Sequence, residues 1–510
     1  MPIRSATFLL VICFSVIFSN VQKDSVEPVS YGDIINSPKE NWLTYGGDYF
    51  SQRHSPLNQI NQKNISNLKL KWKFRISDSE NTRGTPLVHN GIMYATNANG
   101  VFAINALSGK QLWYWKASDK KIKGLNRGVA LLDNEVFFVT GDCKLTALNK
   151  TTGELLWQNK YAYGKGYYCT LAPLAMRGRV VVGVSIVDNE KTRGFVASFD
   201  AKDGKEIWRF LTTPSLGESG SETWGGFNPE KGGAATWASG SYDPESNIIY
   251  WTTGSPLPNF EGGKKRLGDN LYSNCLLALD ANTGKLKWYF QFTPHDIHHW
   301  DSNEVPVLVN EVWSNKNKNL ILQANRNGFF YVLDRTNGKF LFGKPFVKKL
   351  TWTNGLDKNG SPVVMAGTGS LKIGKAGDCP SLFGATNWMS PSYNTKTKTF
   401  YTVAIEGCEQ ESSQTYIKAI DPFSGHIKWE YLLNGTQFIT AGVISTSGGL
   451  IFTGDKNKKF IALDADTGQL LWSYLLGYYV FASPISYVID GIQYIAISAG
   501  EMIYTFSLKI

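Results

Sequence analysis

The groups best suited to chemistry are crowded into one short segment, "TPHDIHHWDS" at 293–302. This segment holds three imidazoles and two carboxylates, which belong to His295, His298, His299, Asp296 and Asp301. Such groups could move protons or hold a metal ion. A zinc site, however, would need a matching cysteine or a repeat of zinc-ligand spacing, and neither accompanies these histidines. We therefore interpret the histidines and Asp296 as groups that shape the loop or that support the residues in contact with a ligand.

A repeated segment close to AxDxxTGxxxW provides the framework that must position this loop. The segment occurs seven times and ends at Trp113, Trp157, Trp208, Trp288, Phe342, Trp429 and Trp472. In each copy an apolar run ends one strand, the Asp/Asn-x-x-Thr/Ser-Gly stretch favours a tight turn, and a second apolar run begins the next strand. Each copy therefore predicts a β-hairpin, and the recurrence indicates a repeat architecture.

The spacing of the repeats favours a propeller with eight blades. Radially arranged four-stranded sheets, each with a tryptophan against the turn of the next, form a β-propeller. The motif glycines lie 43 to 54 residues apart, except for two longer intervals at 204–284 and 338–425. An eighth unit can be built from the segment around Trp72 and the C-terminal segment 492–508. We predict an all-β, eight-bladed propeller closed by strands from both ends of the chain.

The N-terminus predicts export. One arginine precedes an apolar run of about a dozen residues and a polar stretch, which is typical of a signal peptide and too short for a membrane span. We expect residues 1–22 to be the signal peptide and residues 23–510 to form one propeller domain, periplasmic or secreted, without a transmembrane segment. Cys13 follows Ile12 inside the apolar run, which argues against a lipid anchor.

Five cysteines remain after this signal peptide: Cys143, Cys169, Cys275, Cys379 and Cys408. Export permits disulfides. We predict a disulfide between Cys379 and Cys408, which flank a strand and turn, and expect the other three to be small buried apolar residues. No CxxCH motif is present, so the sequence predicts no covalently attached c-type haem.

The net charge of +10 does not by itself indicate a nucleic-acid partner. The basic residues are dispersed, and export makes nucleic acid an improbable ligand. A positive excess suits an anionic cofactor or an acidic redox partner equally well. We interpret most of these charges as a solvated surface.

Segments between the repeats resemble the quinoprotein alcohol dehydrogenases. The segments that carry this resemblance are 41–61, 126–130, 240–254, 293–302, 325–335 and 384–393. Members of the family are eight-bladed propellers that hold pyrroloquinoline quinone (PQQ) and a metal ion on the central axis. The resemblance extends over nearly the whole mature chain, in the order of the family, and implies the same fold and cofactors.

The resemblance also implies a set of cofactor contacts. Arg127 is expected to bind the carboxylates of PQQ through a charge-assisted fork. Thr170 and Ser185 match hydroxyl groups that contact the cofactor. Trp237 matches the residue on which the flat quinone stacks, and it lies outside every repeat motif. Asn387 matches a polar contact to the ring.

Catalytic and metal-binding roles follow from the same resemblance. Asp301 matches the carboxylate that accepts the alcohol proton, and Arg326 matches the arginine that stabilises charge on the reduced ring. Asp188, Ser255 and Asp301 occupy the positions of the Glu, Asn and Asp that bind calcium in the family. All three offer oxygen, as a hard cation requires.

The chain departs from the family at several positions. Asn303 replaces the second aspartate of lanthanide-using members, so we expect Ca²⁺. Lys121 and Ile122 replace a pair of adjacent cysteines, and Thr440 replaces a tryptophan. Arg83 replaces a cofactor-facing glutamate, and this either adds a partner for the cofactor's carboxylates or reflects a local misalignment.

Together these features predict an exported enzyme that oxidises an alcohol by hydride transfer to PQQ. Since the chain has no haem motif, its electrons are expected to pass to a separate acceptor such as a soluble cytochrome c. One alternative is a non-catalytic propeller that binds proteins, similar to the lipoprotein subunit of outer-membrane barrel assembly. Another is a degenerate dehydrogenase that binds the quinone without turnover, as Ser255 and Arg83 suggest.

Overall fold

The computed structural model is built almost entirely of β-strands. It describes residues 27–36, 39–77, 81–117, 125–187, 192–368, 378–409, 412–435 and 440–508. Within these ranges there is one α-helix, α1 (Tyr31–Asn36). The 3-10 helices of the same ranges are Ile65–Asn67, Ser221–Trp224, Pro229–Lys231 and Phe260–Lys265.

Seven blades follow one another along the chain, each with four antiparallel strands in sequence order. The first four are β3 (Leu87–His89), β4 (Ile92–Asn97), β5 (Gly100–Asn105), β6 (Gln111–Lys116); β7 (Ala130–Leu132), β8 (Glu135–Val139), β9 (Lys144–Asn149), β10 (Leu155–Lys160); β12 (Leu174–Met176), β13 (Arg179–Val182), β15 (Phe195–Asp200), β16 (Glu206–Leu211); and β17 (Ser241–Asp243), β18 (Ile248–Thr252), β19 (Cys275–Asp280), β20 (Leu286–Gln291). The next three are β21 (Val307–Trp313), β22 (Lys316–Ala324), β23 (Phe329–Asp334), β24 (Phe340–Pro345); β27 (Ser392–Asn394), β28 (Thr399–Glu406), β29 (Gln414–Ile420), β30 (Ile427–Leu432); and β31 (Ile444–Thr446), β32 (Leu450–Gly454), β33 (Lys459–Asp464), β34 (Leu470–Leu475).

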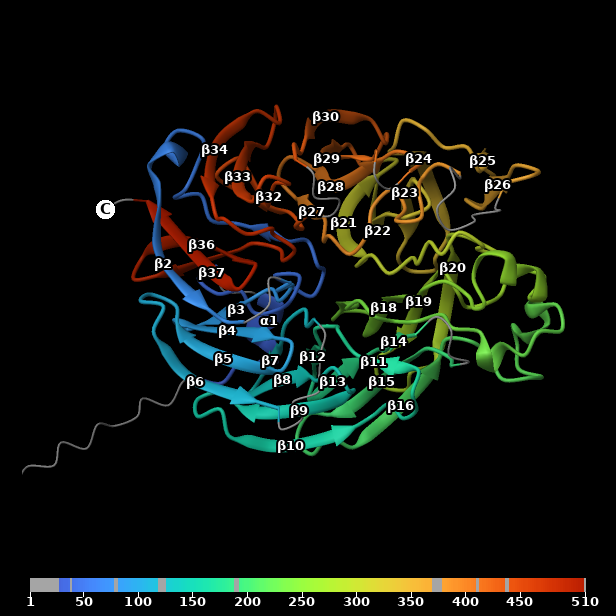
Figure 1. The fold of residues 1–510 in the computed structure, drawn as a ribbon, viewed down its shortest axis with the longest axis horizontal. Helices are drawn as coiled ribbons and strands as arrows, with labels where there is room; N and C mark the ends of the chain where they lie inside the picture. Colours follow the sequence, from blue (N-terminus) through green and yellow to red (C-terminus); the bar gives the residue numbers. More distant parts are fainter. Residues whose placement is uncertain are drawn as a thin grey trace, which may run out of the picture.

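The eighth blade joins the two ends of the chain. Its strands are β35 (Ile485–Ile489), β36 (Ile492–Ala499), β37 (Met502–Leu508) and β2 (Leu68–Arg75). Antiparallel pairing of β2 with β37 runs from Leu68 opposite Leu508 to Arg75 opposite Met502. The predicted eight-bladed propeller, with strands from both ends in one blade, is therefore confirmed (Figure 1).

Smaller elements decorate the blades. β1 (His54–Ser55) pairs in parallel with β31, at the inner edge of the last complete repeat. Two additional two-stranded antiparallel sheets lie outside the blades, and they are β11 (Tyr167–Tyr168) with β14 (Ser185–Ile186), and β25 (Thr353–Leu356) with β26 (Pro362–Val364).

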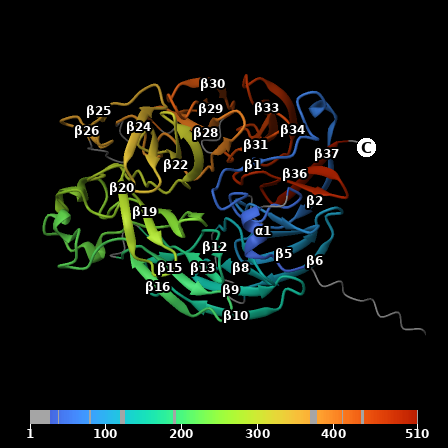
Figure 2. The same cartoon turned by 180° about the vertical axis from the view of Figure 1, so that it is seen from behind.

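The blades surround a central axis. In Figures 1 and 2 the fourth strands, such as β6, β10 and β16, lie at the rim of the disc. The first strands of neighbouring blades contact one another, as β7 does with β12, β17 with β21, and β27 with β31. Loops that lead into the first strands therefore converge on the axis.

A segment at residues 42–53 crosses the axis and bonds to one blade after another. The Tyr49 hydroxyl donates to Ala175 O at 2.9 Å in β12. The carbonyl oxygens of Tyr49, Phe50, Gln52 and Arg53 accept from backbone N–H groups in β17, β21, β27 and β31. The Arg53 guanidinium donates to the Val443 and Pro484 carbonyls. We call this segment, residues 42–53, the axial strap. It bonds to strands of five blades: β12, β17, β21, β27 and β31.

In six of the seven repeats the aromatic residue lies against a glycine of the next blade, and Trp472 is the exception. Trp113 packs on Gly153, where a methyl group would come within 2.7 Å of the indole, and its Nε1 donates to Lys150 O at 3.1 Å. The same contact recurs for Trp72 with Gly109, Trp157 with Gly204, Trp208 with Gly284, Trp288 with Gly338, Phe342 with Gly425, and Trp429 with Gly468. These contacts tie neighbouring blades together at their turns.

The cysteine predictions are only partly correct. The disulfide between Cys379 and Cys408 is confirmed, and Cys275 is a buried thiol as expected. The prediction that Cys143 and Cys169 are unpaired is wrong, because they form a second disulfide. Cys143 lies between β8 and β9, and Cys169 precedes β12 of the neighbouring blade. Packing of the two blades brings them together.

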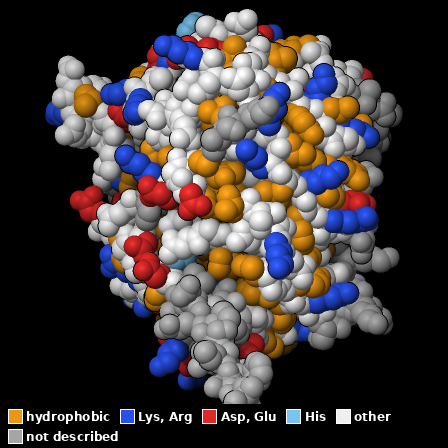
Figure 3. All heavy atoms as spheres, turned by 90° about the vertical axis from the view of Figure 1, so that its left-hand side faces the viewer, with side chains coloured by type: hydrophobic (Ala, Val, Ile, Leu, Met, Phe, Trp, Pro, Cys, Tyr) orange, Lys and Arg blue, Asp and Glu red, His pale blue; other side chains and the backbone are white. Residues whose placement is uncertain are grey.

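The surface agrees with the dispersed charge of the sequence. On the face in Figure 3, lysine and arginine side chains stand as separate groups among apolar and uncharged ones. Among the helices that the structure describes, none has the length and apolarity needed to cross a bilayer.

Candidate functional site

A cavity of about 490 Å³ brings the predicted site residues together. Every cofactor-binding or catalytic residue proposed from the sequence lines it: Arg127, Thr170, Ser185, Trp237, Asp301, Arg326 and Asn387. Residues more than 250 positions apart in the chain thus line the same cavity. A cavity of this volume is ample for a tricyclic ligand.

These side chains converge because most occupy the same place in successive blades. Each precedes the first strand of its blade by three to six residues: Arg127 before β7, Thr170 before β12, Trp237 before β17, Asp301 before β21 and Asn387 before β27. Since the first strands encircle the axis, residues at their entrances point toward a common space. The axial strap bonds to residues within these strands or directly before them, farther along the chain than the cavity residues. It therefore crosses the axis at a different level from the cavity.

The Asp301 carboxylate is held by two hydrogen-bond donors and a nearby guanidinium. Trp237 Nε1 donates to Oδ2 at 2.9 Å, and the Ser255 backbone N–H donates to Oδ1 at 2.6 Å. Arg326 Nη1 lies 3.6 Å from Oδ2. Burial raises the pKa of Asp301, but His299, Arg326 and these hydrogen bonds outweigh burial, so the pKa is lowered. Asp301 is therefore ionised at neutral pH.

Arg127 and Arg326 have donors left for a ligand. Arg127 Nη1 donates to Thr170 Oγ1 at 2.6 Å, and Thr170 Oγ1 lies 3.3 Å from Ser185 Oγ. The Nε groups of Arg127 and Arg326 are buried without a hydrogen-bond partner among the described residues. Since buried donors are normally satisfied, these groups fit the carboxylate and carbonyl oxygens of PQQ.

Asn387 lines the cavity together with the aromatic residues Phe383 and Trp388. Asn387 Nδ2 donates to Phe383 O at 3.0 Å, and its Oδ1 accepts from the Trp388 backbone N–H at 3.0 Å. Both groups of the amide thus bond to its own loop. Trp388 Nε1 is buried and has no partner within the described part of the chain.

Ser255, one of the predicted metal ligands, lies beside Asp301, which is another. The Ser255 hydroxyl donates to Asp296 Oδ2 at 2.9 Å, while the backbone of the same residue holds Asp301. Asp188, the third predicted ligand, lies outside the described residues. In the ranges that the structure covers, no group of three or more His, Cys, Asp and Glu could hold a metal ion. Ser255 and Asp301 nevertheless offer only oxygen, which fits Ca²⁺.

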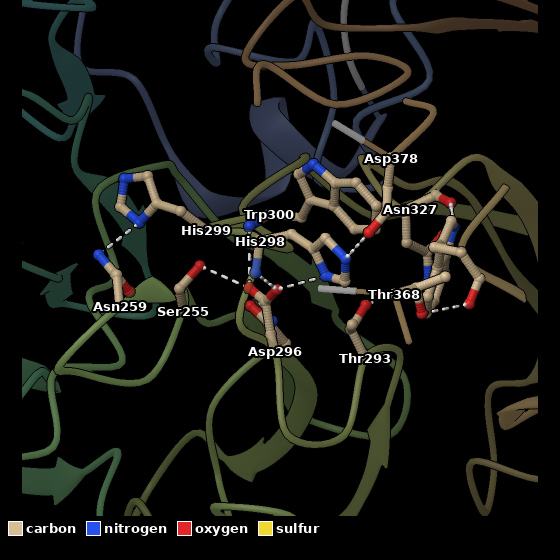
Figure 4. A network of polar contacts seen from close by, with 12 residues as sticks. Ser255, Asn259, Thr293, Asp296, His298, His299, Trp300, Asn327, Thr368 and Asp378 are labelled. Carbon is tan, nitrogen blue, oxygen red and sulfur yellow. Dashed lines mark hydrogen bonds and ion pairs between the residues drawn. The ribbon is translucent and has the colours of Figure 1, made fainter. Parts of the chain in front are cut away.

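Asp296 is the anchor of the histidine-rich loop (Figure 4). Its Oδ2 accepts from Asn274 Nδ2 at 2.9 Å and from the Trp300 backbone N–H at 2.8 Å, besides the Ser255 hydroxyl. His298 lies 3.6 Å from Asp296 Oδ1 through Nδ1, and its Nε2 is 3.0 Å from Asp378 Oδ2. The His298 ring stacks on Trp300 at 4.0 Å. These contacts fit the interpretation of Asp296 and His298 as loop-shaping groups.

Comparison with known proteins decides the family. The family model for the β-propeller domain of glucose/ethanol/alcohol dehydrogenases, the PQQ family, matches residues 42–345 and 425–495. The chain belongs to the quinoprotein alcohol dehydrogenases. It is therefore a PQQ-dependent oxidoreductase, and the resemblance noted from the sequence is confirmed.

Individual members of this family match over most of their length. Quinoprotein alcohol dehydrogenase PedH of Pseudomonas putida is 36% identical, over 92% of this chain and 88% of that protein. The structure of quinohemoprotein alcohol dehydrogenase from Comamonas testosteroni matches with a TM-score of 0.86 and 29% identity, over 94% of this chain and 82% of that one. A europium-containing methanol dehydrogenase matches with a TM-score of 0.83 and 26% identity, over 93% and 99%.

The structure describes Arg83, Thr440 and Asn303, three of the positions at which the chain departs from the quinoprotein family. Arg83 lines the cavity, as expected of a residue that faces the cofactor. Thr440 is buried and its hydroxyl donates to Gly454 O at 2.6 Å. Asn303 is buried close to Gly254. Lys121 and Ile122 lie outside the described residues.

Several cavity residues were missed by reasoning from the sequence. They are Leu125, Tyr168, Phe260, Leu382 and Phe383, together with His299, which we had interpreted as loop-shaping, and Trp388. Leu125 could have been found from its distance to the first strand of its blade. Phe260, Leu382 and Phe383 lie in long inserted loops, where the sequence offers no periodic signal.

Proposed function

We propose that this protein is an exported quinoprotein dehydrogenase that oxidises an alcohol or a related hydroxyl compound by hydride transfer to PQQ. Ca²⁺ serves as the Lewis acid, and the electrons pass to an external acceptor such as cytochrome c. The observation that supports this most directly is the ionised Asp301 carboxylate in a cavity with unsatisfied arginine donors. Membership of the quinoprotein family supports it independently.

Asp301 accepts the proton of the alcohol. An alcohol releases hydride from its carbinol carbon only as the hydroxyl proton leaves, so a carboxylate beside the substrate is required. The Trp237 indole and the Ser255 backbone N–H hold the carboxylate in one orientation. When bound, PQQ would supply the hydride acceptor, and Ca²⁺, held by Ser255 and Asp301, would supply Lewis-acid chemistry.

The arginines and hydroxyls bind and orient. Arg326 places a positive charge 3.6 Å from Asp301 and stabilises negative charge that develops beside it. Arg127, Thr170 and Ser185 bind the anionic end of the cofactor, and Trp237 supplies a flat surface against its rings. Asn387 adds a polar contact, and Ser255, Asp301 and Asp188 supply oxygen ligands for Ca²⁺.

The proposed export and electron transfer rest on the composition of the N-terminal segment, on the cysteines and on the motifs of the sequence. Residues 1–22 serve as the signal peptide, which places the mature chain in the periplasm or outside the cell. The disulfides Cys143–Cys169 and Cys379–Cys408 fit an oxidising compartment. Without a CxxCH motif the chain depends on a separate electron acceptor.

Reconstitution tests this proposal. The purified protein is incubated with PQQ and Ca²⁺, and dye reduction is followed with primary alcohols, secondary alcohols and aldehydes. We expect quinone absorbance in the protein fraction and alcohol-dependent turnover. Absence of bound quinone refutes the proposal, whereas binding without turnover supports the degenerate dehydrogenase suggested by Ser255 and Arg83.

A further inference from the structure

Arg83 is a further arginine that lines the cavity together with Arg127. Its guanidinium lies 4.0 Å from the centre of the Trp388 ring and 5.5 Å from that of Phe481. Its Nε donates to Asn81 Oδ1 at 3.1 Å. Aromatic contacts of this kind hold a planar guanidinium in a defined orientation while leaving its edge available.

The cavity carries more positive than negative charge. Three arginines line it, Arg83, Arg127 and Arg326, but Asp301 is the only acidic side chain among its described lining residues. Asp301 lies beside Arg326. The charge of Arg127 adds to burial in lowering the pKa of Arg83 to about 9, so Arg83 remains charged at neutral pH. No carboxylate among the described residues acts on either Arg83 or Arg127.

Arg127 is buried and Arg83 is partly buried, and two like charges in one cavity without a counter-ion are unfavourable unless a ligand compensates them. PQQ carries several carboxylates, and Arg127 is already proposed to bind them. We infer that Arg83 acts together with Arg127 as a two-arginine clamp on the carboxylates of PQQ. This inference rests on the proposed function, and it assigns a binding role to a residue at which the family has a glutamate.

The clamp is tested by cofactor binding rather than by activity. The mature apo-protein is titrated with PQQ at fixed Ca²⁺, and the dissociation constant is obtained from quenching of tryptophan fluorescence. Loss of one charge-assisted contact in Arg83→Gln should weaken binding roughly ten- to one-hundred-fold. Arg83→Glu should weaken it further, and Arg83→Lys, which keeps a point charge, should lie between wild type and Arg83→Gln.

The dependence of binding on salt separates a clamp from a structural role. If Arg83 contacts carboxylates, the rise of the dissociation constant with salt should be shallower in Arg83→Gln than in wild type and should persist in Arg83→Lys. Arg177→Gln is the matched control, because Arg177 also stacks on an aromatic ring, that of Tyr31 at 5.2 Å, but does not line the cavity. This control should bind PQQ like wild type.

The outcomes distinguish this inference from the proposed function. If wild type binds PQQ and Arg83→Gln binds within twofold with the same salt dependence, the clamp is refuted while the dehydrogenase proposal stands. If wild type binds no quinone, the proposed function itself fails. Should Arg83→Gln not fold, as judged by circular dichroism, Arg83→Lys decides: a wild-type salt dependence supports the clamp, and a lost one contradicts it.

Discussion

At the scale of residues, Asp301 is central to the site because Trp237, Ser255 and Arg326 together fix the orientation of its carboxylate. An indole N–H, a backbone N–H and a guanidinium surround one buried carboxylate. Such an arrangement fixes the direction of a proton acceptor before the substrate arrives, which lowers the cost of orienting it during the reaction. Two substitutions separate proton transfer from orientation.

Asp301→Asn removes the proton acceptor but keeps the size of the side chain. We expect kcat to fall by about 10² to 10⁴, since this is the usual contribution of a general base, while bound quinone absorbance persists. Stopped-flow reduction of the reconstituted protein and its absorbance spectrum measure the two effects. Loss of quinone binding would instead show that Asp301 is chiefly a ligand for the metal.

Trp237→Phe keeps an aromatic surface but removes the N–H that holds Asp301 at 2.9 Å. We expect kcat to fall by about tenfold, equivalent to one hydrogen bond, with little change in the affinity for PQQ. Trp313→Phe, a tryptophan outside the cavity, is the control and should leave both quantities unchanged. Equal loss of affinity and turnover in Trp237→Phe would contradict an orienting role for its N–H.

At the scale of elements, most blades are attached to the next by an aromatic residue that covers a turn glycine. Gly153 has a φ of +76°, and the Trp113 indole leaves no room for a methyl group there. Both the backbone conformation and the packing therefore require glycine at this position.

Gly153→Ala tests this attachment. We expect the free energy of unfolding to fall by about 2–4 kcal/mol, from the left-handed conformation together with displacement of the indole. Gly178→Ala is the matched control: its φ is +69°, but no atom lies within 4 Å of the added methyl, so only about 1–2 kcal/mol should be lost. Denaturant unfolding measures both. Equal losses would mean that the aromatic contact does not limit this position.

At the scale of the whole molecule, closure depends on segments far apart in the chain. β2 pairs with β37, and the axial strap at 42–53 bonds to the inner strands of successive blades. Where the strap leaves the axis, His54 lies between Ser445 at 2.8 Å and Ser447 at 3.3 Å. Protonation of His54 therefore affects the contact between β1 and the seventh blade.

Burial, and to a smaller extent Lys396, lowers the pKa of His54 to about 4 from its usual 6.5. The unfolded chain thus binds a proton that the folded chain rejects between pH 6.5 and 4, so stability is full above pH 6.5 and falls as the pH drops through this window. We expect a loss of about 1–3 kcal/mol from this group. His54→Gln should flatten the pH dependence of the unfolding free energy over the same window; an unchanged slope would assign the acid sensitivity elsewhere.

What the sequence by itself determined was local or repeated. Each hairpin motif specifies its own turn and strands through glycine and side-chain hydrogen bonds, so the number of blades and their closure could be predicted. The resemblance pointed to Asp301 and Arg326, which stand in two of its segments, and to Trp237, which stands outside every repeat motif. Only the tertiary structure decided which blades lie beside one another at the axis. Packing of neighbouring blades joins Cys143 to Cys169, and convergence of loops places Arg83 with Arg127, since contacts between distant segments leave no periodic trace in the sequence.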